Sequence, residues 1–264
     1  MSHNAFWSWI DGLYTNTPQL SFSSGGIQHG YGLFETIYYA NGITHALPEH
    51  LSRLHHSAYQ FRLSPPDIDL APIIDELIAR NHLSEARVKI SLHAVGSDYS
   101  PHTLPTTLSV STSPYERKPQ SYSLWSAPAA QFGCPLSRHK STSYASYIMA
   151  KQAARLYEAD DTLLLNHHGN PIECSSANIL LHHQGQWFSP DLSAQGLRGI
   201  QLLSITEQCH ALSIPLQTAD LSLNTPWDAA VICNSLIGAQ PVAKIDNRPL
   251  NPQIANDLIQ QLRF

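Results

Sequence analysis

One lysine of this chain, Lys140, stands among hydroxyl side chains just before an expected helix. Four such residues follow it directly: Ser141, Thr142, Ser143 and Tyr144. A lysine amine that is held in one place can form a Schiff base with an aldehyde, which allows covalent catalysis. The other lysines stand in a strand, a polar connection, a helix and after a strand: Lys89, Lys118, Lys151 and Lys244. Taken alone, the segment around Lys140 is more typical of a solvated loop.

An acidic residue follows a turn signal further along the chain. The stretch from Gly169 to Asn178 begins with a Gly-Asn-Pro turn and continues with Glu173 and small polar residues. A carboxylate that faces a pyridine nitrogen keeps that nitrogen protonated, and the ring then accepts the electrons of a carbanion. A single glutamate after a hairpin is more commonly a surface residue, so Glu173 has weight only beside the other motifs.

Three further positions suit a phosphate group. Arg53 carries a guanidinium that can bind phosphate through two hydrogen bonds. Gly199 precedes an expected helix, where backbone N–H groups bind anions, and Ser235 ends an apolar strand. A solvated arginine, a helix cap and a strand-end cap would look the same when taken singly. Together, an amine, an acid and phosphate contacts indicate pyridoxal 5'-phosphate (PLP) as a cofactor.

The elements that must position these residues form an α+β pattern with an antiparallel bias. In the first half we predict strands over residues 6–10, 34–40, 87–94 and 106–112, with helices from residue 48 and over 67–82. Asn41-Gly42 predicts a hairpin turn. The helix that carries Arg53 has apolar residues at helical spacing, which predicts a buried stripe: Leu51, Leu54, Ala58 and Phe61.

Residues 113–119 are polar, contain two prolines and form the best candidate for a linker. We predict an N-terminal α/β domain over 1–113, a linker over 114–120 and a C-terminal α/β domain over 121–264 that carries Lys140. In the second half, strands are predicted over 121–127, 162–166, 178–182, 186–189 and 229–233. Helices are predicted over 146–158 and 200–210.

The composition disfavours several classes of protein. Of 264 residues, 42% are hydrophobic and 13% charged, which suits a sizeable core and an oligomer. The net charge of -5 and the absence of a basic cluster disfavour nucleic-acid binding. Neither a signal peptide nor a membrane-length apolar run is found, so we expect a cytoplasmic protein. The cysteine spacing and the adjacent histidine pairs predict neither a disulfide framework nor a metal site.

The motifs follow one another in a defined order along the chain. They are Phe34-Glu35-Thr36, His50-x-x-Arg53-Leu54, Lys140, Glu173-x-x-x-x-Asn178, Gly199-Ile200 and Asn234-Ser235. This order resembles the class IV aminotransferase family, the fold-type IV PLP enzymes, over about residues 9–242. The resemblance implies a two-domain, mixed α+β and α/β fold like that of D-amino acid aminotransferases, with PLP in the cleft between the domains. It also implies a homodimer that acts on a small molecule.

The resemblance assigns roles to individual residues. Lys140 matches the lysine that holds PLP and then acts as general base, Glu173 the partner of the pyridine nitrogen, and Arg53 the phosphate arginine. Thr36 is expected to help deliver a proton in catalysis. Further cofactor contacts are expected from Tyr144, Ser176, Ala177, Gly199, Ile200, Gln201 and Ser235.

The subfamily is predicted from fewer residues. Threonine after Phe-Glu resembles the lyases of the family, whereas branched-chain aminotransferases tend to have glycine there; residues 231–242 also resemble the lyase form. We predict a PLP-dependent lyase that converts 4-amino-4-deoxychorismate to 4-aminobenzoate and pyruvate in folate biosynthesis. The alternatives are an aminotransferase of D- or branched-chain amino acids, a PLP-binding relative without turnover, and a chain that keeps the motifs as scaffold without PLP.

The chain departs from the family pattern at three places. Ser24-Gly25-Gly26 replaces Asp-Arg-Gly, and Gly30-Tyr31-Gly32 replaces Gly-Asp-Gly. An arginine that is common after the third strand is missing from the stretch His93 to Asp98. In relatives such arginines help to hold a substrate carboxylate, so these departures concern the substrate more than the cofactor.

Overall fold

A computed structural model describes residues 6–96, 102–127, 135–193 and 195–264. The chain divides into two compact units: the first is Met1–Glu116 with Lys140–Tyr144, and the second is Arg117–His139 with Ala145–Phe264. Lys140 therefore packs with the first unit, although the chain on both sides of its segment belongs to the second. Cys134, one of the four cysteines of the chain, and Asp98 lie outside the described residues.

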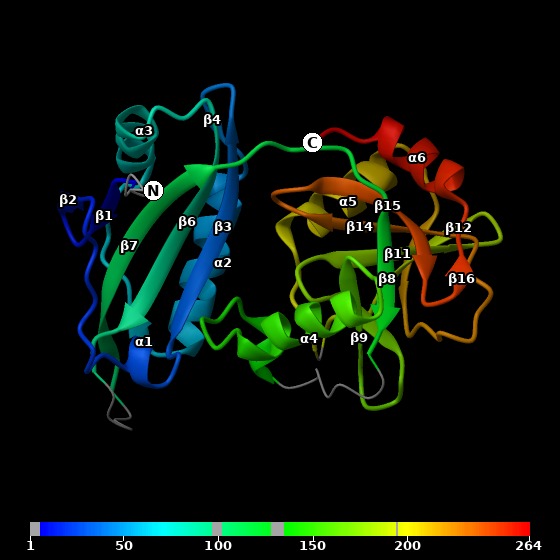
Figure 1. Cartoon of the computed structure of the whole chain (residues 1–264), viewed down its shortest axis with the longest axis horizontal. Helices are drawn as coiled ribbons and strands as arrows, with labels where there is room; N and C mark the ends of the chain where they lie inside the picture. Colours follow the sequence, from blue (N-terminus) through cyan, green and yellow to red (C-terminus); the bar gives the residue numbers. More distant parts are fainter. Residues whose placement is uncertain (1–5, 97–101, 128–134, 194) are drawn as a thin grey trace. The chain divides into compact units, whose positions relative to one another are not determined.

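In the first unit, seven of the described strands form a sheet (Figure 1). They are β1 (Ser8–Ile10), β2 (Leu13–Thr15), β3 (Gly32–Ala40), β4 (Ile43–Thr44), β5 (Leu63–Ser64), β6 (Glu85–Ala94) and β7 (Leu104–Pro114). The order is β2-β1-β7-β6-β3-β4, with β5 beside β7, and the pairs are antiparallel except β5–β7. The predicted Asn41-Gly42 turn is confirmed, because both residues have the positive φ angles, 53° and 76°, that such turns require.

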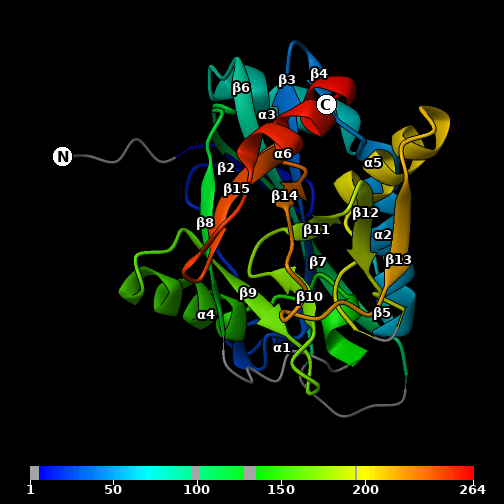
Figure 2. The same cartoon turned by 90° about the vertical axis from the view of Figure 1, so that its right-hand side faces the viewer.

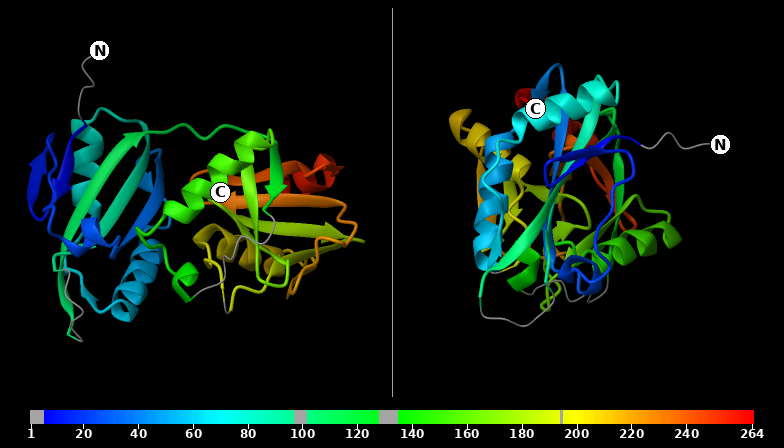
Figure 3. Two further views of the ribbon diagram at one scale, coloured as in Figure 1. Left: turned by 60° about the horizontal axis from the view of Figure 1, so that its bottom comes forward. Right: turned by 90° about the vertical axis from the view of Figure 1, so that its left-hand side faces the viewer.

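Helices α1 (Gly25–Gln28), α2 (Leu47–Gln60) and α3 (Ala71–Arg80) complete this unit. One face of the sheet and the apolar sides of α2 and α3 enclose its core. Figure 3 shows the ribbon of the chain in two further views. The predicted stripe of α2 is confirmed, since Leu54 and Ala58 are buried in that core and Leu51 and Phe61 pack against it.

The predicted start of the second helix at residue 67 is wrong, because α3 begins at Ala71. A proline inside a helix clashes with the carbonyl group four residues earlier, so Pro72 fits only within the first turn of α3. The carboxylate of Asp69 accepts a hydrogen bond from the Ala71 N–H at 3.1 Å and helps to define this start.

In the second unit, nine of the described strands form a sheet in the order β10-β9-β8-β15-β14-β11-β12-β13, with β16 beside β15 (Figure 2). The strands are β8 (Tyr122–Ser126), β9 (Asp161–Leu165), β10 (Pro171–Cys174), β11 (Asn178–His183), β12 (Gln186–Pro190), β13 (Leu216–Ala219), β14 (Ala229–Asn234), β15 (Gly238–Ile245) and β16 (Arg248–Pro249). The helices are the short 3-10 helix η1 (Pro135–Arg138), α4 (Ala145–Leu156), α5 (Ile200–Ala211) and α6 (Pro252–Gln261).

Apolar side chains cover both faces of this second sheet. One cluster packs α5 and α6 against β11, β12 and β14, and a second joins β8, β9, β11, β14 and β15. A strand was predicted before Lys244, and Lys244 itself lies within β15. The elements that were not predicted from the sequence are β10, β13, β16 and α6, with α1, β2, β4 and β5 in the first unit. The linker candidate over residues 113–119 starts too early, because Ser113 and Pro114 still belong to β7 and pair with Arg87 and Ala86 of β6.

Within the described residues, no helix combines the length and apolar character that a membrane span requires.

Candidate active site

The segment that carries Lys140 is bound along strand β3. The Phe34 N–H donates to the Lys140 carbonyl group at 2.8 Å, and the Thr142 N–H donates to the Gly32 carbonyl group at 2.9 Å. Leu33 and Ser141 form an antiparallel bridge between these two bonds. The backbone of Lys140 is therefore held by the strand that contains the Phe-Glu-Thr motif.

The two glycines of Gly30-Tyr31-Gly32 make this close approach possible. A Cβ atom on Gly32 would lie 2.6 Å from the Leu92 carbonyl oxygen and 2.9 Å from Thr142 Oγ1. Gly30 has a φ angle of +63°, and its carbonyl oxygen accepts hydrogen bonds from the hydroxyl groups of Thr142 at 2.8 Å and Ser143 at 3.0 Å. The hydroxyl-rich run after Lys140 thus serves to anchor the segment to β3.

The amine of Lys140 lies against aromatic rings. Its Nζ atom is 4.6 Å from the ring centroid of Phe34 and 5.9 Å from that of Tyr144, and the two rings meet edge to face. Thr36 lies two residues beyond Phe34 on β3, and alternate residues of a strand share one face of the sheet. The structure therefore brings Lys140, Tyr144 and Thr36 to the same side of β3.

Arg53 forms an ion cluster with the glutamate of the Phe-Glu-Thr motif. Its Nε and Nη2 atoms donate to Glu35 Oε1 and Oε2 at 2.9 and 2.6 Å, while His50 Nδ1 lies 2.7 Å from Oε2. Burial raises the pKa of Glu35, but the hydrogen bonds and charges of Arg53 and His50 outweigh burial and hold this pKa below its usual value. The two opening motifs are thus physically joined, and Glu35 faces the α2 side of β3, opposite to Phe34.

Glu173 is buried rather than a surface residue. It lies on β10 with 5% of its surface exposed, and its Oε2 accepts a hydrogen bond from the Leu197 N–H at 3.1 Å. The Tyr147 hydroxyl group donates to Oε1 at 3.3 Å. A buried carboxylate fixed in this way is suited to face a protonated ring nitrogen.

Gly199 lies directly before α5 and has no side chain to cap it. The first N–H groups of a helix have no intrahelical acceptor, so those of Ile200 and Gln201 can bind an anion. A Cβ atom on Gly199 would lie only 1.9 Å from Asn178 Oδ1, and the Asn178 amide donates to the Leu197 carbonyl group at 2.8 Å. The asparagine of the Glu-x-x-x-x-Asn motif therefore positions the chain that leads into α5.

The Ser176 hydroxyl group already has protein partners. It donates to Asp161 Oδ2 at 2.8 Å and accepts from the Lys151 amine at 3.0 Å, and Asp161 also accepts from Ser175. The side-chain amide of Asn234, next to Ser235, donates to the Ser176 carbonyl group at 2.8 Å. Ser176 and Ala177 thus lie on one turn and Ser235 on another, and Asn234 joins the two turns.

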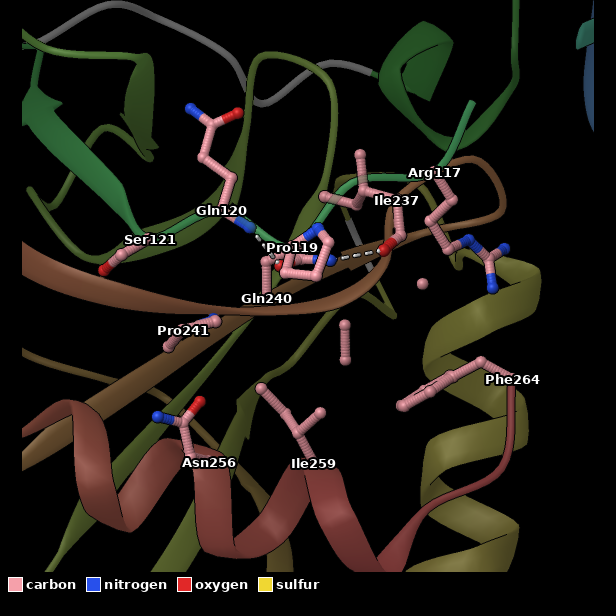
Figure 4. Close-up of a pocket in the computed structure, with 12 residues that line it drawn as sticks. Arg117, Pro119, Gln120, Ser121, Ile237, Gln240, Pro241, Asn256, Ile259 and Phe264 are labelled. Atoms are coloured by element: carbon pink, nitrogen blue, oxygen red, sulfur yellow. Dashed lines mark hydrogen bonds between the residues drawn. The ribbon is translucent and has the colours of Figure 1, made fainter. Parts of the chain in front are cut away.

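A cavity of about 450 Å³ lies elsewhere in the second unit, between β15, α6 and the segment before β8 (Figure 4). Its lining includes Arg117, Gln120, Ile259 and Phe264, but no predicted site residue. Arg117 donates to the carbonyl groups of Ser235 and Leu236, at 3.1 and 2.8 Å. Arg117 therefore connects this cavity to the turn that carries Ser235.

Several residues that support these positions were not predicted from the sequence. They are His50, Tyr147, Asp161, Asn178 and Asn234, together with Glu35 as the partner of Arg53. Glu35, His50, Asn178 and Asn234 stand inside the quoted motifs, so the motifs themselves pointed to them. Tyr147 and Asp161 carry no local signal, because their partners are distant in the sequence.

Residues 32–245 match the family described as amino-transferase class IV. The "Putative aminodeoxychorismate lyase" of Schizosaccharomyces pombe is 31% identical over 66% of this chain and 73% of that protein. The D-alanine aminotransferase of Listeria innocua is 22% identical over 94% and 92% of the two chains. The solved structure of a "Putative 4-amino-4-deoxychorismate lyase" from Legionella pneumophila is 25% identical, with a TM-score of 0.84 over 92% and 94% of the two chains.

The chain therefore belongs to the class IV aminotransferase family. It has the mixed α+β fold of that family, with its two sheets. Family membership indicates PLP as the cofactor. The donor set fits this cofactor, since the chain supplies an amine between aromatic rings, a buried carboxylate and the uncapped start of a helix.

Proposed function

We propose that this chain is a lyase that converts 4-amino-4-deoxychorismate to 4-aminobenzoate and pyruvate, with Lys140 as the residue that binds PLP. The observation that carries the proposal is the position of Thr36. Its hydroxyl group lies on the same side of β3 as the Phe34 ring that the Lys140 amine contacts. The similarity to proteins named as lyases of this substrate supports the same function.

The reaction needs neither water nor a redox partner. The carbon that bears the substrate amine loses a proton, the bond to the ether oxygen of the enolpyruvyl group breaks, and the ring becomes aromatic. The departing enolpyruvate takes up one proton at carbon and becomes pyruvate, so atoms and electrons balance. PLP, when bound, supplies an electron sink beside the amine-bearing carbon.

The residues of the chain divide this work. We assign the removal of the proton from the amine-bearing carbon to the Lys140 amine. We assign the delivery of a proton to the departing enolpyruvyl group to Thr36. Glu173 would keep the ring nitrogen protonated, and Tyr144 would lie beside the ring. Arg53, the N–H groups of Gly199, Ile200 and Gln201, and Ser235 would bind the phosphate group, while Ser176 and Ala177 would line the ring.

The test is product detection with purified, PLP-loaded protein and enzymatically generated 4-amino-4-deoxychorismate. We expect equimolar 4-aminobenzoate and pyruvate, both lost in Lys140→Ala together with the visible absorbance of bound PLP. Thr36→Val should lower kcat about one-hundred-fold or more, within the usual contribution of a proton-transfer group, while Thr36→Ser retains activity. Turnover that survives in Lys140→Ala would contradict the assignment.

An aminotransferase is the second candidate, because it shares the first proton transfer and because D-alanine aminotransferases are similar to this chain. It would show a PLP absorbance without lyase products, and would transfer the amino group of a D- or branched-chain amino acid to a 2-oxo acid. A homodimer and a cytoplasmic location remain predictions from the resemblance and the composition.

A further inference from the structure

Each oxygen atom of the buried Glu173 carboxylate accepts a hydrogen bond from an uncharged donor. The Leu197 N–H donates to Oε2 at 3.1 Å, and the Tyr147 hydroxyl group donates to Oε1 at 3.3 Å. Hydrogen bonds of this kind favour the ionised form of a carboxylate. Because neither donor carries a charge, neither neutralises the charge with which a protonated ring nitrogen would pair.

The backbone donor is fixed by the packing of its own loop. The N–H group of Gly196, the residue before Leu197, donates to Ser137 Oγ at 3.0 Å. Gly196 has a φ angle of +82°, and an added Cβ atom would lie 2.6 Å from Ile172 Cγ2 and 3.7 Å from Glu173 Cδ. The loop therefore lies close against β10. On the other oxygen the donor is a side chain, that of Tyr147 on α4.

Helix α4 is tied to the same part of the second unit one turn after Tyr147. The Lys151 amine donates to Ser176 Oγ at 3.0 Å, and the Thr162 hydroxyl group donates to the Ala150 carbonyl group at 2.5 Å. Residues four apart lie on one face of a helix, so Tyr147 and Lys151 point toward the same turn. These bonds hold the backbone of α4 in the place from which Tyr147 reaches its partner.

Apolar packing does not account for Tyr147. The buried residues of α4 are Ala150 and Ala154, while Ile148 and Met149, which follow Tyr147, are 52% and 67% exposed. Tyr147 is half-buried and belongs to neither apolar cluster of the second sheet. What α4 supplies at this position is therefore a hydroxyl group directed at a buried carboxylate.

We infer that Tyr147 is a positioning residue for the protonated ring nitrogen of PLP, through the Glu173 carboxylate that it holds. The inference rests on the proposed function, in which Glu173 faces that nitrogen, and it applies equally to a lyase and to an aminotransferase. A carboxylate that is stabilised in its ionised form competes less for the shared proton, so the proton stays on the ring nitrogen. Tyr147 acts through Glu173 and not by contact with the substrate.

The test is nitrogen NMR on the protein loaded with PLP whose ring nitrogen is isotopically labelled, because the chemical shift of this atom separates its protonated from its unprotonated form. We expect a protonated nitrogen in the wild type at neutral pH. Tyr147→Phe should lower the pH at which the nitrogen loses its proton by about one unit, which corresponds to the lower end of the usual range for a hydrogen bond to a charged group. The alkaline limb of the kcat profile should shift by the same amount.

The matched control is Tyr157→Phe, which removes a hydroxyl group just beyond the end of α4. Tyr157 is 59% exposed and stacks on Trp125, so this change should leave the titration of the ring nitrogen unaltered. A second control places Tyr147→Phe in a Glu173→Gln background. There it should cause no further shift, because residues that act through one contact do not have additive effects.

The outcomes separate the inference from the proposed function. An unchanged titration in Tyr147→Phe, or a full shift when Glu173→Gln is already present, would overturn the inference while lyase products still support the function. A ring nitrogen that Glu173→Gln leaves unaffected would overturn the role of Glu173 in the proposed function, and the inference with it.

Discussion

The side chain of Glu35 is a buried charge whose ionised state depends on two partners. Removing one member of a buried, hydrogen-bonded ion cluster leaves uncompensated charge, which typically costs about 3–5 kcal/mol. We expect Glu35→Gln to lower the free energy of unfolding by this amount in urea titrations at neutral pH. The matched control is Glu76→Gln, since Glu76 forms an exposed pair with Arg80 and should cost less than about 1 kcal/mol.

The same cluster makes stability depend on pH. The pKa of Glu35 is lower in the folded than in the unfolded chain, where it is near 4.5, so the unfolded state binds the proton more readily. The contribution is fully present above the unfolded pKa and is lost as pH falls through the folded pKa. The urea midpoint should therefore drop on acidification below about 4.5 in the wild type, and part of this drop should be absent in Glu35→Gln.

Three buried thiol groups should be unreactive in the folded protein. Burial raises the pKa of Cys233 to about 12, raises that of Cys174 well above its usual value, and raises that of Cys209. Since the thiolate is the reactive form, iodoacetamide at pH 8 should modify these cysteines only after unfolding. Peptide mapping by mass spectrometry checks this, and rapid labelling of Cys174 in the native protein would show that its surroundings are open.

At the scale of elements, Gly32 lets the Lys140 segment dock on β3. Gly32→Ala would place a Cβ atom 2.6 Å from the backbone oxygen of Leu92, which cannot rotate away. We expect faster hydrogen exchange at the Thr142 amide, which donates to the Gly32 carbonyl group. We also expect at least ten-fold weaker PLP binding, because the backbone of Lys140 would no longer be held against β3.

The control for this change is Gly12→Ala. Gly12 has a φ angle of +97° but no atom within 4 Å of an added Cβ atom. Gly12→Ala should therefore lower the free energy of unfolding only through backbone strain, by about 1 kcal/mol, and should leave PLP binding unchanged. Normal Thr142 protection in Gly32→Ala would show that the glycine is not needed for the docking.

The sequence predicts an element well where its pattern is local and long. The apolar residues of α2 recur over several helical turns, and buried and exposed residues alternate along most of β6. Both elements were predicted. β10 has four residues beside turn signals and is buried throughout, so it shows no alternation. Helix α6 was not predicted, although Asn251 caps it and Pro252 starts it, and only Ala255 and Leu258 of this helix are buried.

The same distinction applies to the predicted site. The joint order of the motifs identified Lys140, Glu173 and Arg53 as candidates, because each of them taken singly is more typical of a solvated residue. The bonds from Phe34 to Lys140 and from Leu197 to Glu173 join residues that lie far apart in sequence, and no spacing rule reports them.

At the scale of the whole molecule, the chain builds separate cores. The first lies between one sheet and helices α2 and α3, and the others lie on the two faces of the second sheet. The Lys140–Tyr144 segment belongs to the first unit, while its flanking residues belong to the second. The domains predicted over 1–113 and 121–264 remain a prediction, and unfolding of the full chain can test whether the two units are cooperative entities.

We expect two unfolding transitions, each sensitive to its own core. Ile74 and Ile205 are fully buried, in the first unit and in the second, and truncation of such a side chain to alanine costs about 2–5 kcal/mol. In urea titrations, Ile74→Ala should shift one transition and Ile205→Ala the other, whereas Ile43→Ala, at a residue that is 57% exposed, should shift neither. Because the Lys140 segment passes from one unit to the other, PLP bound at Lys140 should move both transitions upward by mass action. A single transition that both core variants shift equally would mean that the chain unfolds as one cooperative unit.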